Sequence, residues 1–297
     1  MARIGLRGRI IIITLGLFVL LIIGSLLFPM PRPHVVLPAE AIFHIGGFPI
    51  YNTLLASWIT IVVLVAMFYF GTRKMKLIPK GWQNAMETVY EALYNFVEGV
   101  AGEENARRFF PAIATIFLYV IMAAFISLLP GFDTILAGHE GAPLLRKANT
   151  DINFPLALAV ISFIFVQYCG IRALGFRHYG SKFIRVGQLF HSIGQLVRGK
   201  VRSGLSGLFT GFIDIFVGAL EAISEFVRII SFTFRLFGNM TAGMVLLLMI
   251  MFLIPWVVAV PFYGLEMLLG FVQALIFGGL TLVFATIAVR PHGAEQE

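Results

Sequence analysis

Long apolar segments separated by short polar ones are the main feature of this sequence. Apolar runs without a charged residue cover residues 10–28, 53–70, 111–129 and 154–171, and a last run covers 262–289 with Glu266 as its only charged residue. Each run is about as long as a helix needs to cross roughly 30 Å of hydrocarbon. A longer apolar segment, 205–252, also carries charged side chains. The runs predict an all-α integral membrane protein with about six helices that cross the bilayer.

The composition agrees with this fold class. Hydrophobic residues make up 59% of the chain and charged residues 12%, whereas soluble domains have about 45–50% and about 25%. The net charge is +7, but the basic residues lie between the apolar runs, so we expect no nucleic-acid partner. No metal-ligand spacing occurs, and the histidines lie outside the runs, so we expect no metal, no cofactor and no intramembrane catalytic site.

The basic residues predict the orientation of the chain. Lys and Arg are frequent in segments 71–108 and 172–202 and rare in segments 29–52 and 130–153. Cytoplasmic loops of membrane proteins are the ones enriched in Lys and Arg, so the first two segments are expected in the cytoplasm. Arg3, Arg7 and Arg9 then hold the N-terminus inside, and alternation of the crossings places both termini in the cytoplasm.

Residues 1–52 are expected to form a membrane anchor and an outer segment, and residues 53–297 the main membrane domain. The basic start and apolar run within residues 1–41 also fit a signal peptide with a cleavage site near Ala39 and Ala41. That site lies well beyond the run, behind several prolines, which favours retention. Residues 81–99 have apolar side chains at helical spacing, which predicts an amphipathic helix on the cytoplasmic interface.

Segment 205–252 is expected to form one long helix. It has neither Pro nor Gly between residues 218 and 238, and at that length it would measure roughly 70 Å. Because this exceeds the hydrocarbon thickness, we predict two long, steeply tilted C-terminal helices, with a position partly in the interface as the alternative for the first of them. Polar side chains on the first of them form a stripe roughly 80° wide. The stripe consists of Glu221, Glu225, Arg228, Arg235 and Asn239.

Arg235 is the most informative residue of the stripe. Its guanidinium stays charged at any working pH, and no acidic residue lies one helical turn away. The alternatives for an anionic partner are Glu266 and a carboxylate of another subunit. A purely structural ion-pair stripe is the alternative interpretation of the whole set.

Glu266 and Gln273 lie seven positions apart and therefore share a face of the last helix. If this helix is an antiparallel neighbour of segment 205–252, Gln273 lies near the depth of Arg235. Glu266 then lies toward the outside, and Glu221 and Glu225 toward the cytoplasm. Two half-channels separated by a fixed positive charge would require this arrangement.

The ten residues 234–243, FRLFGNMTAG, resemble the signature of subunit a of F-type ATP synthases. Shorter blocks at 102–117, 128–131, 150–159 and 273–277 extend the resemblance over most of the chain. The resemblance implies that Arg235 is the stator arginine that faces the ring of c subunits. It implies that Asn239, Gln273 and Glu221 line the proton path, with Glu225 nearby, and that Glu266 belongs to the outer half. Asp151 and Asn153 match a family block and are expected at the outer entrance.

One position departs from the family pattern. The family usually has an ionisable residue nine positions after the arginine, and here that residue is Met244. Glu266 is therefore expected to act alone or with water molecules.

The implied function is that of a proton-translocating stator subunit with no catalytic site of its own, in a bacterial inner membrane. The implied partners are the c-ring, the b subunits of the peripheral stalk and membrane lipid. A secondary transporter for an anion or a proton is the alternative, although neither inverted repeats nor broken helices are evident. Both H⁺ and Na⁺ fit as the coupling ion.

Overall fold

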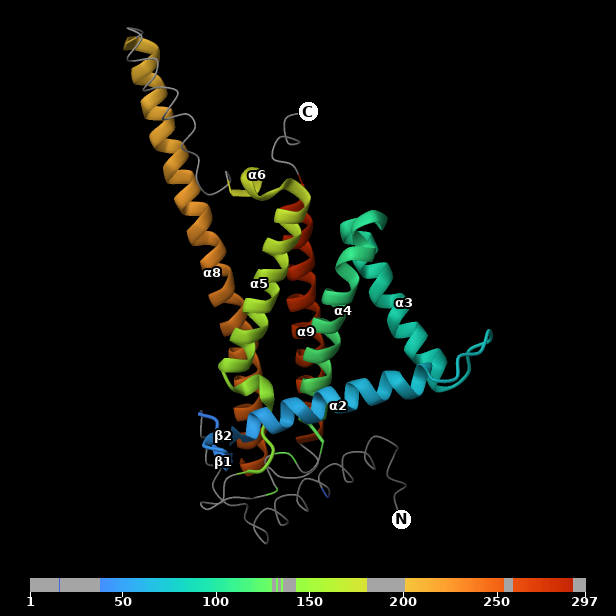
Figure 1. The fold of residues 1–297 in the computed structure, drawn as a ribbon. Helices are drawn as coiled ribbons and strands as arrows, with labels where there is room; N and C mark the ends of the chain where they lie inside the picture. The colour runs from blue at the N-terminus through green and yellow to red at the C-terminus, as the bar shows by residue number, and fades with distance from the viewer. Residues whose placement is uncertain are drawn as a thin grey trace, which may run out of the picture. The chain divides into compact units, whose positions relative to one another are not determined.

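A computed structural model of the chain describes residues 38–129, 132, 135, 143–180, 201–253 and 259–290, together with Gly16. Helices dominate this part of the chain (Figure 1). The elements are β1 (Ala41–Ile45), β2 (Phe48–Tyr51), α2 (Asn52–Thr72), α3 (Trp82–Ala101), α4 (Glu103–Ile126), η1 (Ala148–Thr150), α5 (Asn153–Leu174), α6 (Phe176–Gly180), α8 (Val201–Leu253) and α9 (Ala259–Val289).

The expected class of an all-α membrane protein with two long C-terminal helices is confirmed. Five of these helices, α2, α4, α5, α8 and α9, are long and apolar enough to cross a membrane. They coincide with the five apolar segments that follow residue 52. The first expected crossing, residues 10–28, and most of the alternative signal peptide lie outside the described residues.

A small hairpin precedes the first described span and was not predicted. Strands β1 and β2 pair antiparallel, with Ile45 opposite Phe48. The turn between them consists of Gly46 and Gly47, whose φ angles are 58° and 91°. Glycine adopts positive φ without steric cost, which is why this dipeptide can close a two-residue turn.

Helix α4 begins earlier than the apolar run that predicted it. The run starts at Pro111, which lies inside the helix. The additional turns carry four charged side chains, which form exposed salt bridges between Glu103 and Arg107 and between Glu104 and Arg108. Side chains spaced by four residues face each other on a helix, so a charged segment can be helical without any apolar signal. We call Glu103–Arg108 the polar start of α4.

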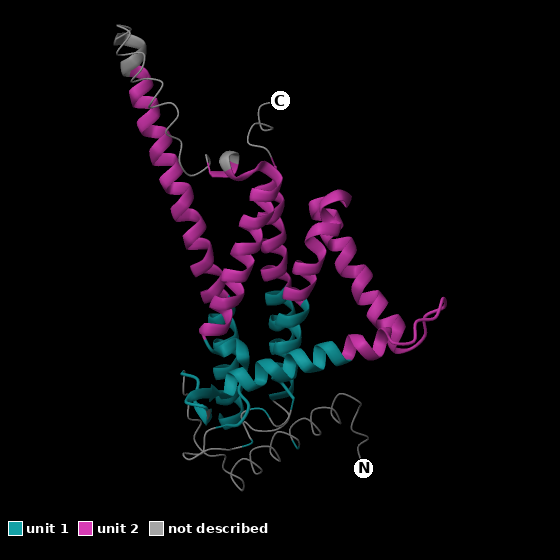
Figure 2. Cartoon of the chain, in the orientation of Figure 1, with its two compact units in different colours: residues 1–66, 118–151, 236–274 teal, residues 67–117, 152–235, 275–297 magenta. Residues whose placement is uncertain are grey.

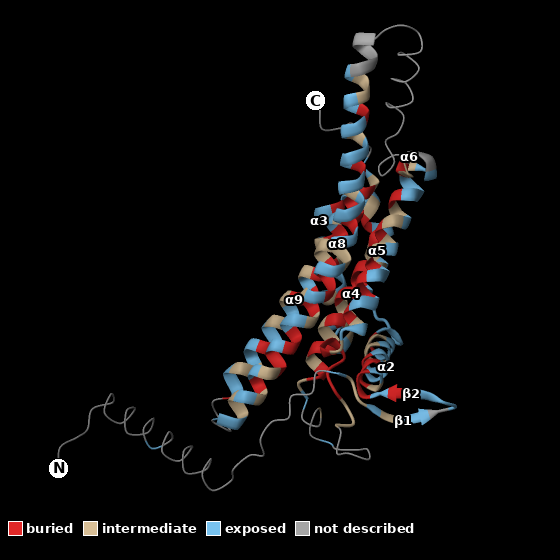
Figure 3. Ribbon diagram, turned by 90° about the vertical axis from the view of Figure 1, so that its left-hand side faces the viewer, coloured by how far each residue is buried: buried red, intermediate tan, exposed pale blue. Residues whose placement is uncertain are grey.

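Helix α8 is continuous over 53 residues, as the absence of proline predicted. Its length is about 80 Å, and its steep tilt stays a prediction. The expected amphipathic helix is α3, which buries Met86, Leu93, Val97 and Ala101 on one face. Figure 3 shows buried and exposed positions alternating along α8 and α9, as helices with one packed face require.

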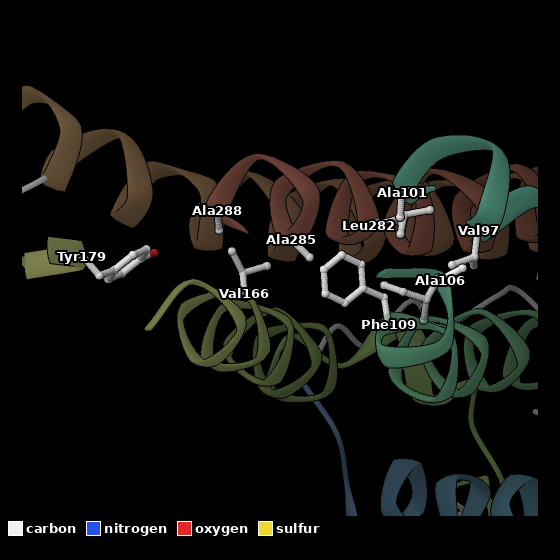
Figure 4. Close-up of a cluster of buried hydrophobic side chains, with 10 residues drawn as sticks. Val97, Ala101, Ala106, Phe109, Val166, Tyr179, Leu282, Ala285 and Ala288 are labelled. Carbon is white, nitrogen blue, oxygen red and sulfur yellow. The ribbon is translucent and has the colours of Figure 1, made fainter. Parts of the chain in front are cut away.

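The chain divides into two compact units (Figure 2). Unit 1 comprises residues 1–66, 118–151 and 236–274, and unit 2 comprises 67–117, 152–235 and 275–297. A buried hydrophobic cluster holds unit 2 together, with side chains from α3, α4, α5, α6 and α9 (Figure 4). Its members are Val97, Ala101, Ala106, Phe109, Ile113, Val166, Tyr179, Leu282, Ala285 and Ala288. Small residues on α9 allow the neighbouring helices to pack closely there.

Candidate functional site

Arg235 is a half-buried residue of α8 without an intrachain counter-ion in the described part of the protein. No ion pair or hydrogen bond joins its guanidinium to any residue that the structure describes. Asn239, one turn further along α8, is exposed on the surface of the chain. A permanent charge on a membrane helix is stable only when it meets water or an anionic group. Within the described residues, the side chain is therefore available to an anion that another molecule supplies.

Other members of the stripe do form contacts within unit 2. Glu225 is buried, and its carboxylate accepts a hydrogen bond from the Gln167 side chain of α5. The Arg228 guanidinium lies 4.0 Å from the Glu225 carboxylate. The ion pair described in the stripe therefore joins Glu225 and Arg228 and does not include Arg235.

Tyr179 of α6 completes this group, which we call the Glu225 network: Gln167, Tyr179, Glu225 and Arg228. The Tyr179 hydroxyl donates to the side-chain oxygen of Gln167, so Gln167 is held by partners on both sides. Burial raises the pKa of Tyr179 to about 12, and the negative charge of Glu225 acts in the same direction. The hydroxyl is therefore neutral at physiological pH and remains a hydrogen-bond donor.

The Tyr179 ring reaches this position because residue 170 is glycine. A Cβ at Gly170 would overlap the Tyr179 ring. The ring therefore packs directly against the backbone of α5.

Glu266 lies in a different ion pair, within unit 1. Its Oε1 atom is 3.0 Å from Nζ of Lys147, and each of the two side chains is only 5% exposed. The sequence offered Arg235 as one partner for Glu266, but the pair that the structure contains joins Glu266 to Lys147. Met244 is itself buried and cannot carry a charge.

Asp151 and Asn153 lie at the N-terminal end of α5. Asp151 is half-buried, and its Oδ2 accepts a hydrogen bond of 2.9 Å from Thr53 at the start of α2. Asn153 is the first residue of α5 and is exposed. The next polar contact is at Asn52, whose side chain donates to the Pro143 carbonyl. These hydrogen bonds hold the start of α2 to the segment that precedes α5.

The predicted site residues fall into both units. Glu221, Glu225, Arg235 and Asn153 belong to unit 2, whereas Asp151, Asn239, Glu266 and Gln273 belong to unit 1. Gln273 is buried on α9. Arg235 and Gln273 belong to different units. That they lie at a similar depth in the membrane therefore stays a prediction.

Sequence reasoning missed Lys147, Gln167 and Tyr179. Gln167 is a polar residue in the middle of an apolar run, and that local signal could have marked it as a contact residue. Lys147 and Glu266 are separated by 119 positions, so no local pattern connects them. Tyr179 gives no such signal either.

Comparison with known proteins shows which family the chain resembles. The profile of the family described as ATP synthase A chain matches residues 54–286. ATP synthase subunit a of Moorella thermoacetica is 29% identical over 257 residues, which cover 86% of this chain and 99% of that relative. ATP synthase subunit a of Helicobacter pylori strain P12 is 31% identical over 238 residues, covering 79% of this chain and 89% of the relative. The same subunit of strain Shi470 is 33% identical over 233 residues, covering 77% and 87%. The chain belongs to the ATP synthase subunit a family and is a multi-pass component of the membrane sector of that complex.

Proposed function

We propose that this chain is the proton-translocating stator subunit of a rotary ATP synthase. In this role it provides two half-channels that load and unload carboxylates on a ring of c subunits. The family membership supports the rotary machine over a secondary transporter. The observation that carries the proposal is the availability of Arg235, which has a permanent charge on a membrane helix and no counter-ion among the described residues.

The electrostatic role of Arg235 follows from its charge. A carboxylate that rotates through lipid must be protonated, because an isolated charge in hydrocarbon is very costly. When the same carboxylate comes close to a guanidinium in a medium of low dielectric constant, its ionised form is stabilised. Arg235 therefore promotes release of the proton, and its positive charge also repels protons that would leak directly between the two paths.

The inner path lies near Glu221 and Glu225 in this proposal. Glu225 is buried and accepts a hydrogen bond from Gln167, which gives a carboxylate in an apolar interior the partner that it needs. Glu221 is half-buried on the same helix, one turn earlier. These two acids would accept protons from the rotor carboxylate and pass them to the cytoplasm.

The outer path contains Glu266, with Asp151 and Asn153 at its entrance. Asn239 and Gln273 would line the route next to Arg235. A proton arrives from outside, passes Glu266 and neutralises a rotor carboxylate. That carboxylate then turns through the lipid, reaches the inner path and is deprotonated there.

The exposed apolar surface of α8 supports contacts of this helix with lipid and with other subunits. Phe209, Phe212 and Phe216 are 70%, 68% and 58% exposed within the chain, and large exposed apolar patches mark contacts with membranes or other proteins. We propose the c-ring, the b subunits of the peripheral stalk and lipid as the partners. We place the protein in a bacterial inner membrane with both termini in the cytoplasm, residues 1–52 as its anchor and residues 53–297 as its channel domain.

The test is ATP synthesis in vesicles that contain the complete complex. Arg235→Gln should reduce synthesis driven by an imposed proton gradient to background, because the stator charge is lost. Arg107→Gln is the control, since it removes an exposed cation whose salt bridge contributes little, and it should leave synthesis unchanged. Normal synthesis by an assembled Arg235→Gln complex would refute the proposal.

A further inference from the structure

Three segments of unit 1 meet at the Glu266 carboxylate. Lys147, just before η1, contacts Oε1 at 3.0 Å. Gly243 of α8 lies beside the other oxygen, and a Cβ at this position would overlap the carboxylate. Glu266 itself projects from α9, and its side chain is 5% exposed. We call this arrangement the Lys147–Glu266 pair.

The burial of the pair limits how its charges can change. A buried ion that loses its partner is strongly destabilised, whereas the two ions together satisfy each other. Lys147 has no other ion-pair partner among the described residues. The charge of Glu266 is thus coupled to that of Lys147.

Position 244 of α8 does not provide a charged partner for Glu266. Met244 is buried and apolar, so α8 provides no ionisable side chain there, although the resemblance to the family leads one to expect it. The cation at position 147 comes instead from the segment between α4 and α5.

We propose that Lys147 is the ionisable partner of Glu266 in the outer half of the proton path, and that it acts as a positioning residue. This inference rests on the proposed function. An incoming proton binds the Glu266 carboxylate, which becomes neutral and separates from the Lys147 ammonium group. The proton then passes from Glu266 to the rotor carboxylate, Glu266 becomes an anion again, and the pair closes. While Glu266 is neutral the Lys147 cation has no partner, and this cost favours the return of Glu266 to the ionised form that can accept the next proton.

Four variants in the complete complex test this role: Lys147→Gln, Lys147→Arg, Glu266→Gln and the double variant Lys147→Gln/Glu266→Gln. The measurements are ATP synthesis driven by an imposed proton gradient in proteoliposomes and the amount of the subunit in the purified complex. Lys147→Gln should reduce synthesis per assembled complex by about tenfold or more. Lys147→Arg keeps the charge and should restore most of the activity.

The double variant separates a functional pair from a structural one. It removes both charges and leaves no unpaired ion, so it should assemble at the wild-type level even if Lys147→Gln alone does not. Its rate of synthesis should nevertheless remain as low as that of Glu266→Gln, because position 266 has no carboxylate to carry the proton. Wild-type synthesis by the double variant, or by assembled Lys147→Gln, would overturn the inference.

Arg235→Gln in the same series separates the role of Lys147 from the proposed function of the chain. Loss of synthesis in Arg235→Gln together with full activity in Lys147→Gln would refute only the role of Lys147. Full activity in Arg235→Gln would refute the proposed function itself.

Discussion

The guanidinium carbon of Arg228 lies 3.6 Å from the centre of the Phe284 ring, so a cation of α8 rests on an aromatic side chain of α9. The same guanidinium also lies near the Glu225 carboxylate. An arginine over an aromatic face gains about 0.5–2 kcal/mol, with the larger values where water is excluded. Phe284 therefore helps to fix the cation of the Glu225 network.

Replacing Phe284 with Leu should destabilise unit 2 by about 1 kcal/mol, because Leu fills much of the space but has no π face. Phe284→Tyr is the matched control, since it retains the ring. The denaturant midpoint of the purified chain in detergent measures the difference. Equal midpoints for Phe284→Leu and the wild type would show that the cation–ring contact adds no stability.

Gly243→Ala should disturb the Lys147–Glu266 pair. The new methyl group would overlap the Glu266 carboxylate, and inserting a carbon into a packed site costs about 1–3 kcal/mol. The expected result is lower ATP synthesis per assembled complex. Gly264→Ala is the control on α9, because its Cβ would meet no atom within 4 Å. If the two variants synthesise ATP equally fast, the close contact between Gly243 and Glu266 is not required for ATP synthesis.

Tyr179 should make stability depend on pH in the alkaline range. Its pKa is raised from 10 to about 12, first by burial and then by the charge of Glu225. The folded chain therefore disfavours the tyrosinate, and an unfolded tyrosine ionises near pH 10. The contribution of this group is present below pH 10 and is lost progressively as the pH rises from 10 to about 12.

The measurement is the difference in thermal stability between wild type and Tyr179→Phe, taken from pH 8 to pH 12 in steps. Phenylalanine retains the ring but cannot ionise, so the advantage of the wild type should shrink above pH 10. A difference that stays constant over this range would contradict the assignment of a neutral, buried hydroxyl.

Ser162 of α5 and Thr281 of α9 should show unequal effects when they are replaced. Their hydroxyl oxygens are 2.7 Å apart, and the Thr281 hydroxyl donates to the Phe277 carbonyl. Ser162 must therefore be the donor to Thr281. Thr281→Val leaves the buried Ser162 hydroxyl without its acceptor and should cost about 1–3 kcal/mol, whereas Ser162→Ala should cost less.

The double variant Ser162→Ala/Thr281→Val completes this cycle. It removes both hydroxyls, so no buried donor is left without an acceptor, and its loss of stability should be smaller than the sum of the single losses. Denaturant unfolding of the four proteins gives the coupling energy. Strict additivity would mean that the two hydroxyls do not interact.

The spans could be predicted from sequence because the bilayer sets their length. Runs 53–70 and 154–171 lie inside α2 and α5, which extend only a few residues further. The polar start of α4 was not predicted because its charged side chains give no apolar signal, although Ala106 within it packs into the buried cluster of unit 2. Hairpin β1–β2 was not predicted by the length of apolar runs either, since its strands are too short to span a membrane.

The candidate residues on α8 could be selected from sequence, but most of their partners could not. The spacing of Glu225 and Arg228 is local, and the structure brings their side chains together. The partner of Glu266 depends on how a segment before α5 folds back onto α9, and helical periodicity contains no information on that contact. Lys147 is therefore a residue that only the tertiary structure could identify.

The four charged side chains in the polar start of α4 are 64–86% exposed. Ions with so much accessible surface require hydration, and the apolar run of the same helix follows within a few residues. We therefore expect the edge of the hydrocarbon layer to cross α4 close to Pro111. Any molecule that approaches Glu103 or Arg107 does so through the aqueous phase, even though the rest of this helix is immersed in lipid or packed within the protein.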